Sequence, residues 1–307
     1  MKGITKFIAY GLAMSFFTLI LITSTFAIQI QLAYAQVNVN NTTDSNNIQN
    51  NVLITKILAK NLENRLQKAG AILEVTSKLP QVRNVSYAHL LNQTLNILHG
   101  IPRDADIEKR QVAKNIIDSN SGLYKVFFIM PNGDMYFLEP FSTQQTLTAN
   151  NYAFRDYFQG AIKTSDTYLG NVIIATAASH PREAVIAVPV YSLRDNSTIV
   201  GVWAGSIDFG ILNKELQSLN LTSLDDNTRV VYVDSNGQKV ADSDVNKSAT
   251  PESFANLNSF KNAVNGQSGS IIDTVGNTNM LITYKPVKAF QNTFVVLLMQ
   301  ANNSNIN

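Results

Sequence analysis

The chain contains no cysteine in its 307 residues. This absence excludes a disulfide-bonded scaffold, a thiolate metal site and a cysteine nucleophile. Export stays open, because a chain of this length can bury a core that holds without disulfides. Charged residues are also scarce, at 15%. Apart from Lys2 and Lys6, the chain has 22 basic and 22 acidic residues, so no basic field would bind nucleic acid.

Residues that commonly carry catalysis are few. The three histidines, His89, His99 and His180, form no pair at metal-ligand spacing. There is no His-Glu-x-x-His, no Gly-x-Ser-x-Gly and no glycine-rich phosphate loop. We interpret the acidic residues near the second β-hairpin as solvated turn residues rather than a cation site: Asp225, Asp226, Asp234, Asp242 and Asp244. The sequence therefore predicts no catalytic residue, no metal and no cofactor.

Only one long apolar run occurs, over residues 7–28, and two lysines precede it. Its length of about 22 residues can span a bilayer, and the preceding charges favour export of the downstream chain. Residues 1–35 are then either a signal peptide cut between Ala35 and Gln36, or an uncleaved signal anchor. Eight Asn-x-Ser/Thr sequons agree with an exported, glycosylated protein of the cell membrane or the medium: Asn40, Asn41, Asn84, Asn92, Asn196, Asn220, Asn246 and Asn302.

A polar, aromatic-free segment occupies residues 36–50 and predicts a linker. Residues 51–83 then predict a stalk helix of about 45 Å, and a shorter helix is expected over 107–117. The stalk carries apolar residues at spacings of three and four: Leu58, Leu62, Leu66, Ala69 and Leu73. This stripe can pack on the chain's own modules, which we favour, or pair two chains as a homodimer.

After residue 120 the pattern becomes strand-like and repeats. Two β-rich runs meet at Asn132-Gly133, and two more meet at Asn236-Gly237, 104 residues later. Each Asn-Gly pair predicts a hairpin, because both residue types accept positive φ. Other segments match in the same order: 158–161 with 260–263, and 188–190 with 285–287.

The repeat predicts an α+β fold of two modules, each an antiparallel sheet with helices packed on it. We place the first module at residues 84–219, the second at 220–300, and a tail at 301–307.

An arginine among aromatic residues stands at the entry to an expected helix, in residues 150–161. A guanidinium binds a carboxylate through two parallel hydrogen bonds, and aromatic walls that exclude water strengthen them. The segment therefore favours a pocket with Arg155 at its base. The alternative is a surface pair of Arg155 with Asp156, with the aromatic residues in the core.

Five segments, taken in order, resemble the double Cache family of extracytoplasmic ligand-sensing domains: 154–164, 167–170, 184–191, 200–202 and 206–208. Such domains occur in chemoreceptors, sensor histidine kinases and cyclic-nucleotide enzymes. The resemblance covers about residues 50–300. It implies one long helix beside two PAS-like modules, membrane-distal and membrane-proximal, with the ligand usually in the distal module.

The resemblance also implies roles for single residues. Arg155 would bind the ligand carboxylate, Tyr157 and Phe158 would wall the pocket, and Asp208 would take an amine. The chain departs from the amino-acid-binding pattern, which has Trp at Tyr157 and Tyr at three further positions: Asn150, Phe158 and Ile173. Lost hydroxyls remove hydrogen bonds of about 1 kcal/mol each. We therefore expect a small carboxylate or amino-acid-like ligand, with Tyr168 or Tyr191 near Arg155.

The resulting expectation is an anchored or secreted double Cache protein that binds a small organic ligand. Without an output domain of its own, it would relay the ligand state to a membrane signalling partner or capture the ligand. The main alternative is a structural or adhesive surface module with a vestigial pocket. An exported hydrolase would need a nucleophile–base pair, which we do not find.

Overall fold

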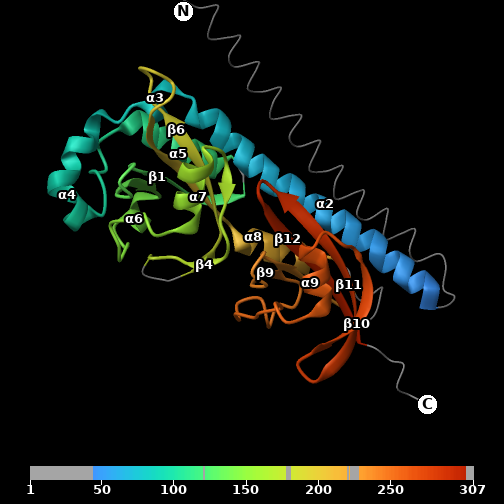
Figure 1. Ribbon diagram of the computed structural model, residues 1–307. Helices are drawn as coiled ribbons and strands as arrows, with labels where there is room; N and C mark the ends of the chain where they lie inside the picture. The colour runs from blue at the N-terminus through green and yellow to red at the C-terminus, as the bar shows by residue number, and fades with distance from the viewer. Residues whose placement is uncertain (1–43, 120–121, 178–180, 220, 222–227, 302–307) are drawn as a thin grey trace, which may run out of the picture.

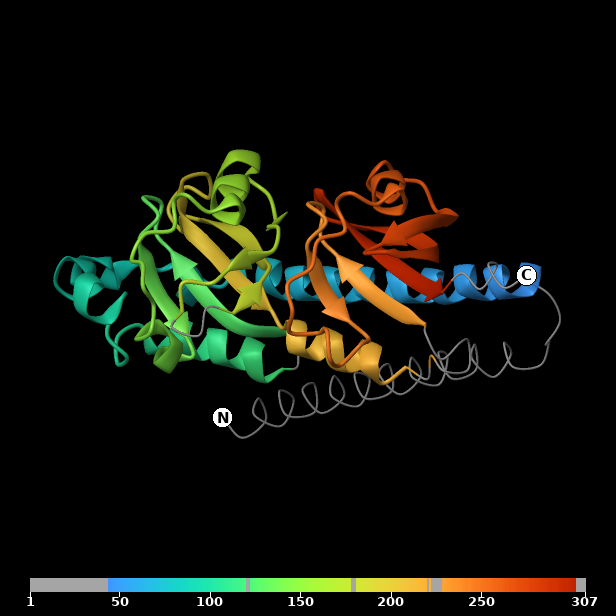
Figure 2. The same ribbon diagram turned by 90° about the horizontal axis from the view of Figure 1, so that it is seen from below.

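The computed structural model describes residues 44–119, 122–177, 181–219, 221 and 228–301. A long helix, α2 (Asp44–Ser77), runs past two modules, each built on a five-stranded antiparallel sheet (Figure 1). The view from below shows both modules on the same side of α2 (Figure 2). The expected α+β architecture of one long helix and two sheet modules is confirmed.

The apolar stripe of α2 is buried along its length. Its five expected members are each at most 4% exposed: Leu58, Leu62, Leu66, Ala69 and Leu73. The helix has 34 residues and is therefore about 50 Å long. It packs on β11 (Thr278–Ala289) and β12 (Asn292–Ala301) of the proximal module and on β6 (Val185–Tyr191) and β7 (Ile199–Ile207) of the distal module. The stripe thus packs on the chain's own modules.

The bounds of α2 differ from the expected stalk at residues 51–83. The helix already includes residues 44–50, which were expected to belong to the linker. A polar residue near the start of the helix is buried against the proximal module: Asn51 is 1% exposed and donates to Gln300 Oε1 at 2.6 Å. The helix ends at Ser77 because Leu79, which precedes Pro80, takes an extended conformation (φ −66°, ψ 137°). Pro80 then begins the short helix α3 (Pro80–Arg83).

The distal module comes after α3, and its sheet has the strand order β2-β1-β7-β6-β3. Its helices are η1 (Ser86–Leu90), α4 (Leu91–Leu98), α5 (Ile107–Asp118), α6 (Phe141–Gln144) and α7 (Asp156–Thr164). Its strands are β1 (Leu123–Ile129), β2 (Met135–Glu139), β3 (Tyr168–Leu169), β6 (Val185–Tyr191) and β7 (Ile199–Ile207), with a separate pair β4 (Ile173–Ile174) and β5 (Arg182–Glu183).

The proximal module repeats this plan with the strand order β9-β8-β12-β11-β10. Its helices are α8 (Phe209–Gln217) and α9 (Asn258–Val264). Its strands are β8 (Arg229–Val233), β9 (Lys239–Asp242), β10 (Gly269–Val275), β11 (Thr278–Ala289) and β12 (Asn292–Ala301). Each strand has its counterpart at the same place in the distal sheet, so the internal repeat of the sequence is a repeat of structure.

The two expected hairpins, β1–β2 and β8–β9, form with one difference in their turns. Only the glycines have positive φ, 92° at Gly133 and 81° at Gly237, while Asn132 and Asn236 do not. A register shift stands next to each turn, which is typical of a type I turn followed by a bulge. The repeat extends further, since the carbonyls of the two glycines accept from the amides of Tyr152 and Phe254, both at 2.7 Å.

The boundary between the modules lies earlier than the expected residues 219 and 220. Helix α8 packs against β9, and Asp242 N of β9 donates to the Asn213 side chain at 2.8 Å. Helix α8 packs on the proximal sheet at the place where α5 packs on the distal sheet (Figure 2). Because α8 directly follows β7 in the sequence, we expected this helix in the distal module. Its contacts place it in the proximal module.

Each sheet separates two layers of core. Alternate residues of a strand point to opposite faces, so Phe128 packs toward α2 and Phe127 toward α7. The core beside α2 is one continuous cluster that includes Trp203 of the distal sheet and Val296 of the proximal sheet. The opposite faces carry separate clusters, one beneath α7 and one beneath α9.

The expected signal or anchor segment at residues 1–35 lies outside the described residues. Within the part of the chain that the structure describes, no helix combines the length and apolarity needed to cross a bilayer. Four sequon asparagines are described, and all are exposed: Asn84, Asn92, Asn196 and Asn246.

Loss of a stripe residue of α2 should destabilise the protein. Leu66 is 1% exposed, so Leu66→Ala should lower the free energy of unfolding by about 2–5 kcal/mol through lost burial and a residual cavity. Val75, on the same helix, is 65% exposed, and Val75→Ala should change it by at most about 0.5 kcal/mol. Chemical denaturation measures both, and equal effects would contradict the packing described for α2.

A lysine of α5 is buried in the distal module. Lys109 Nζ stands 4.3 Å from the ring centre of Phe128, 4.4 Å from that of Tyr136 and 3.2 Å from Asp106 Oδ2. Burial lowers the pKa of Lys109 to about 8, and Asp106 offsets only part of that effect. The folded protein therefore releases this proton at a lower pH than the unfolded chain does.

This difference predicts a rise in stability with pH. Between about pH 8 and pH 10 the unfolded chain binds more protons at Lys109 than the folded protein, so the free energy of unfolding increases with pH. Below about pH 8 both states are protonated and Lys109 contributes no slope. Lys109→Met should remove this part of the rise, whereas the exposed Lys60→Met should keep it. Parallel curves for wild type and Lys109→Met in a pH series of denaturations would contradict the prediction.

Candidate ligand-binding site

A small cavity lies in the distal module, between the sheet and the segments that carry α7 and β4–β5. Its free volume is about 20 Å³. We call it the distal cavity. Its polar lining consists of Lys125, Tyr152, Arg155, Tyr157, Thr176 and Glu183. Its apolar lining consists of Phe127, Met135, Leu138, Leu147, Ile173, Ala175 and Ala177.

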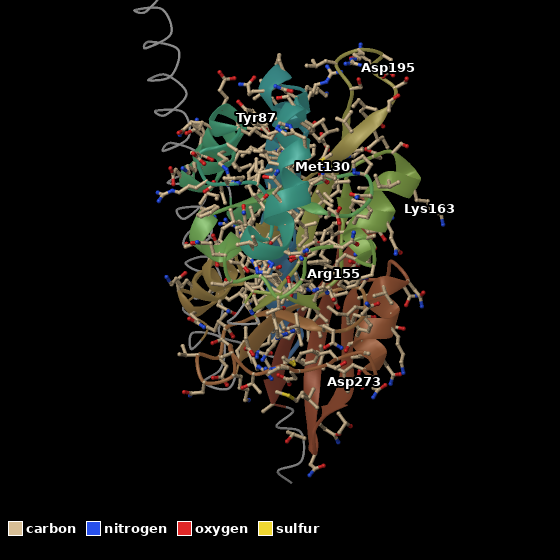
Figure 3. The ribbon with its side chains drawn as sticks, turned by 90° about the vertical axis from the view of Figure 1, so that its left-hand side faces the viewer. Tyr87, Met130, Arg155, Lys163, Asp195 and Asp273 are labelled. Carbon is tan, nitrogen blue, oxygen red and sulfur yellow. The ribbon has the colours of Figure 1, made fainter. Side chains whose placement is uncertain are left out.

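Arg155 directly precedes α7, and its side chain lines this cavity. Its Nη2 donates to Ile174 O of β4 at 2.9 Å, and its guanidinium carbon lies 4.8 Å from the ring centre of Phe154. Its Nε is buried and has no hydrogen-bond partner. Figure 3 shows Arg155 near the middle of the molecule, between Met130 and Asp273. One donor of the Arg155 guanidinium therefore has no protein partner.

The alternative of a surface pair between Arg155 and Asp156 does not form among the described residues. Asp156 Oδ1 accepts from Tyr157 N at 2.7 Å, and its Oδ2 accepts from Asn171 N at 2.9 Å. The Asp156 carboxylate thus fixes the start of α7 and the loop after β3. Arg155 is left with one backbone carbonyl.

The floor of the distal cavity holds an ion pair that the sequence analysis missed. Lys125 Nζ of β1 lies 2.5 Å from Glu183 Oε2 of β5, and the two side chains are 4% and 7% exposed. Tyr124 also donates to Glu183 Oε2, at 2.6 Å. Lys125 interrupts the apolar strand Leu123–Ile129, and a charged residue in a buried strand was the signal that could have pointed to it.

Two further polar groups on this side of the sheet were missed. Tyr152 contacts Thr176 Oγ1 at 2.7 Å and donates to Ala149 O at 3.0 Å. Ser206 of β7 is opposite Lys125 in the register, is fully buried, and has an Oγ atom without a partner. Unpartnered buried polar atoms are rare in folded proteins, so Ser206 and Arg155 are both candidates to bind a water molecule or a ligand.

The electrostatics of the distal cavity favour an anion. Arg155 and Lys125 carry formal positive charges and Glu183 carries the single negative one. Burial raises the pKa of Tyr157 well above its usual range, and Glu183 acts in the same direction. Tyr157 is therefore a neutral phenol at physiological pH. The arrangement offers a guanidinium and neutral aromatic walls, which suit a carboxylate, around a space of about one water molecule.

Two of the expected site residues, Arg155 and Tyr157, line the distal cavity, and Phe158 and Tyr168 do not. Phe158 is 6% exposed and packs in the core cluster beneath α7. Tyr168 lies against Gly160, where a Cβ atom would come within 2.3 Å of its ring. Phe158 thus anchors α7 in the core and Tyr168 packs against that helix, and the wall expected at Phe158 is not part of the cavity lining.

The remaining two expected residues, Asp208 and Tyr191, are also placed elsewhere. Asp208 Oδ1 accepts from Gly210 N at 2.8 Å and from Ile211 N at 3.3 Å, so this carboxylate caps the N-terminus of α8. Asp208 does not line the distal cavity, and the structure does not bring it to Arg155 to bind an amine. Tyr191 lines a second cavity and donates to Ser165 O at 3.1 Å.

This second cavity, which we call the stalk pocket, has a volume of about 370 Å³. It lies between the C-terminal end of α2, α3, strand β6 and the loop that comes after α7. None of its lining residues lines the distal cavity.

Potential metal ligands are accounted for by other contacts. His99 Nδ1 contacts Asn150 Oδ1 at 2.6 Å and His89 Nδ1 contacts Ser86 O at 2.9 Å, while His180 lies outside the described residues. Asp242 is paired with Arg229 and Lys239. Across the ranges that the structure describes, no group of three or more His, Asp or Glu residues could hold a metal ion.

The comparisons with known proteins agree with this architecture. The family model of the Cache domain matches residues 35–306. The periplasmic sensory domain of the Campylobacter jejuni chemoreceptor Tlp1 gives a TM-score of 0.59 at 15% identity, covering 85% of this chain and 96% of that one. The ligand-binding domain of the Pseudomonas fluorescens chemoreceptor CtaA, solved with L-isoleucine, gives a TM-score of 0.55 at 13% identity. The match covers 82% of this chain and 91% of that one. The ligand-binding domain of the Pseudomonas aeruginosa amino acid chemoreceptor PctB, solved with L-Gln, gives a TM-score of 0.52 at 16% identity. The match covers 80% of this chain and 87% of that one.

No curated protein matches the sequence. At the identities given, the solved structures share the fold with this chain. The family match itself spans α2 and both modules. The chain therefore belongs to the Cache domain family.

Proposed function

We propose that this protein is an extracytoplasmic sensor domain that binds a small carboxylate in its distal cavity. The observation that carries the proposal is the buried Nε atom of Arg155, which lacks a partner. A buried donor without a hydrogen bond costs about 1–3 kcal/mol, and a carboxylate removes that cost while adding a charge-assisted bond. The excess positive formal charge of the cavity favours the same ligand.

The ligand must displace side chains to enter. A free volume of about 20 Å³ holds one water molecule and no larger occupant. The bond from Arg155 to Ile174 O is exposed, and breaking it frees Nη2 to form the second hydrogen bond to the same carboxylate. Binding then replaces a contact to the backbone with a bidentate pair.

An amino-acid ligand would use Glu183 rather than Asp208 for its ammonium group. The contacts of Glu183 with Lys125 and with Tyr124 both use Oε2. Its Oε1 atom can therefore accept a hydrogen bond from a ligand. L-isoleucine and L-Gln are the ligands in two of the similar solved structures, which supports this extension of the proposal.

The wider setting rests on the family and the N-terminal sequence. The segment at residues 1–35 exports or anchors the chain, the modules lie outside the cytoplasm, and the ligand state is relayed to a membrane signalling partner or the ligand is captured. Support comes from the occurrence of similar domains in a periplasmic chemoreceptor. Glycosylation of the exposed sequons belongs to this part of the proposal.

The second candidate function is a structural or adhesive surface module. Two observations favour it: the small volume of the distal cavity, and the ion pair that already occupies Glu183. In that case Arg155 would bind only water and the backbone.

A thermal-shift screen of the full chain against acetate, propionate, pyruvate, lactate and amino acids tests the proposal. A ligand at about 100 times its Kd should add roughly 2.7 kcal/mol to the stability of the folded state. Arg155→Ala should abolish the shift, because it removes the carboxylate partner. Lys163→Ala, at an exposed residue of α7, should keep it. Absence of any shift, or a shift that persists in Arg155→Ala, would reject the proposal and favour the structural module.

A further inference from the structure

The stalk pocket has the size of a ligand site, which the distal cavity lacks. Its volume of about 370 Å³ falls within the range of about 300–1,000 Å³ that is usual for small-molecule pockets. It also lies apart from Arg155. In Figure 3, Asp195, the neighbour of the lining residue Asn196, stands at one end of the molecule, whereas Arg155 lies near the middle.

The walls of the stalk pocket are held in place by hydrogen bonds between different elements. Arg83 of α3 donates to Tyr191 O at 2.7 Å, and also to Ser192 O and the Asn196 side chain. Thr167 Oγ1 donates to Glu74 Oε1 of α2 at 2.6 Å. These bonds join residues about 90 to 110 positions apart in sequence, so the pocket is preformed by the fold.

The charges around the stalk pocket balance. Its lining contains two cationic residues, Lys78 and Arg83, and two anionic ones, Glu74 and Asp166. A pocket with this balance has no net preference for an anion or a cation. It differs in this respect from the distal cavity, where formal positive charge is in excess.

The groups of opposite charge do not neutralise each other. Glu74 lies in the last turn of α2, and Lys78 follows four positions later, just beyond the end of the helix. An acidic residue four positions before a basic one favours an ion pair on a helix. Glu74 and Lys78 form none, and one oxygen of the Glu74 carboxylate accepts instead from Thr167. Among the described residues, the ammonium of Lys78, an exposed side chain at the pocket, has no hydrogen-bond or ion-pair partner, and Glu74 has a second oxygen beyond the one that Thr167 uses.

We infer that the stalk pocket binds a small zwitterion, separately from the distal cavity. Lys78 takes the carboxylate of the ligand, and Glu74, with Asp166 beside it, takes the ammonium group. Val188 and Pro189 are buried residues in the lining and offer an apolar surface to the carbon chain between the two charges. A site of this kind selects a molecule that carries both charges over a simple carboxylate or a simple amine.

The test uses glycine, β-alanine and 4-aminobutanoate as probes, with propionate and propylamine as singly charged controls. Titration calorimetry on the full chain should detect binding of at least one zwitterion, and tighter binding than that of either control. Lys78→Met and Glu74→Gln should each weaken that binding about tenfold or more, since each removes a charge-assisted bond. Glu74→Gln keeps an acceptor oxygen for Thr167, so the pocket wall stays in place.

Two further variants separate this site from the distal one. Arg155→Ala should leave zwitterion binding at the stalk pocket unchanged, and Lys163→Met should leave it unchanged as a matched loss of an exposed lysine. The inference is overturned if no zwitterion binds at up to about 10 mM, if Lys78→Met and Glu74→Gln both bind like wild type, or if Arg155→Ala abolishes binding. The last result would assign the ligand to the distal cavity and would support the proposed function instead.

Discussion

The buried stripe of α2 holds the molecule together. It packs on strands of both sheets, so the distal and proximal cores beside it form one continuous cluster. Without this helix each sheet would expose one apolar face to water, at a cost of about 25 cal/mol for each Å². The helix also positions the stalk pocket, because its last turn forms one wall of that pocket.

The rim of the distal cavity is bonded to the proximal module. Asp234 of the proximal hairpin accepts from Val172 N at 2.8 Å, just before β4. Arg182 of β5 donates to Lys239 O of β9. Burial raises the pKa of Asp234, against the effect of three backbone amides that bind its carboxylate. The β4–β5 pair is therefore held between Arg155 on one side and the proximal module on the other.

Local signals in the sequence predicted the main elements of the fold. The spacing of Leu58 to Leu73 predicted the buried face of α2, and the two Asn-Gly pairs predicted both hairpins, because these features depend on neighbouring residues. The assignments of α8 and Asp208 depended on the direction that the chain takes after β7, which sequence order does not determine. Lys125 and Glu183 are 58 positions apart and meet only in the folded sheet. Tyr168 or Tyr191 was expected near Arg155, and Tyr191 lines the stalk pocket instead.

The central claim is that the open Nε–H of Arg155 binds the carboxylate of a ligand. A nitrogen–proton correlation spectrum of the arginine Nε groups measures this directly. The Arg155 signal is identified by its absence in Arg155→Lys. On titration with acetate or propionate, that signal should move to higher proton frequency in a saturable way, while the Arg83 and Arg110 signals stay in place. A spectrum in which Arg155 does not respond, or in which all arginine signals move together, would contradict the account.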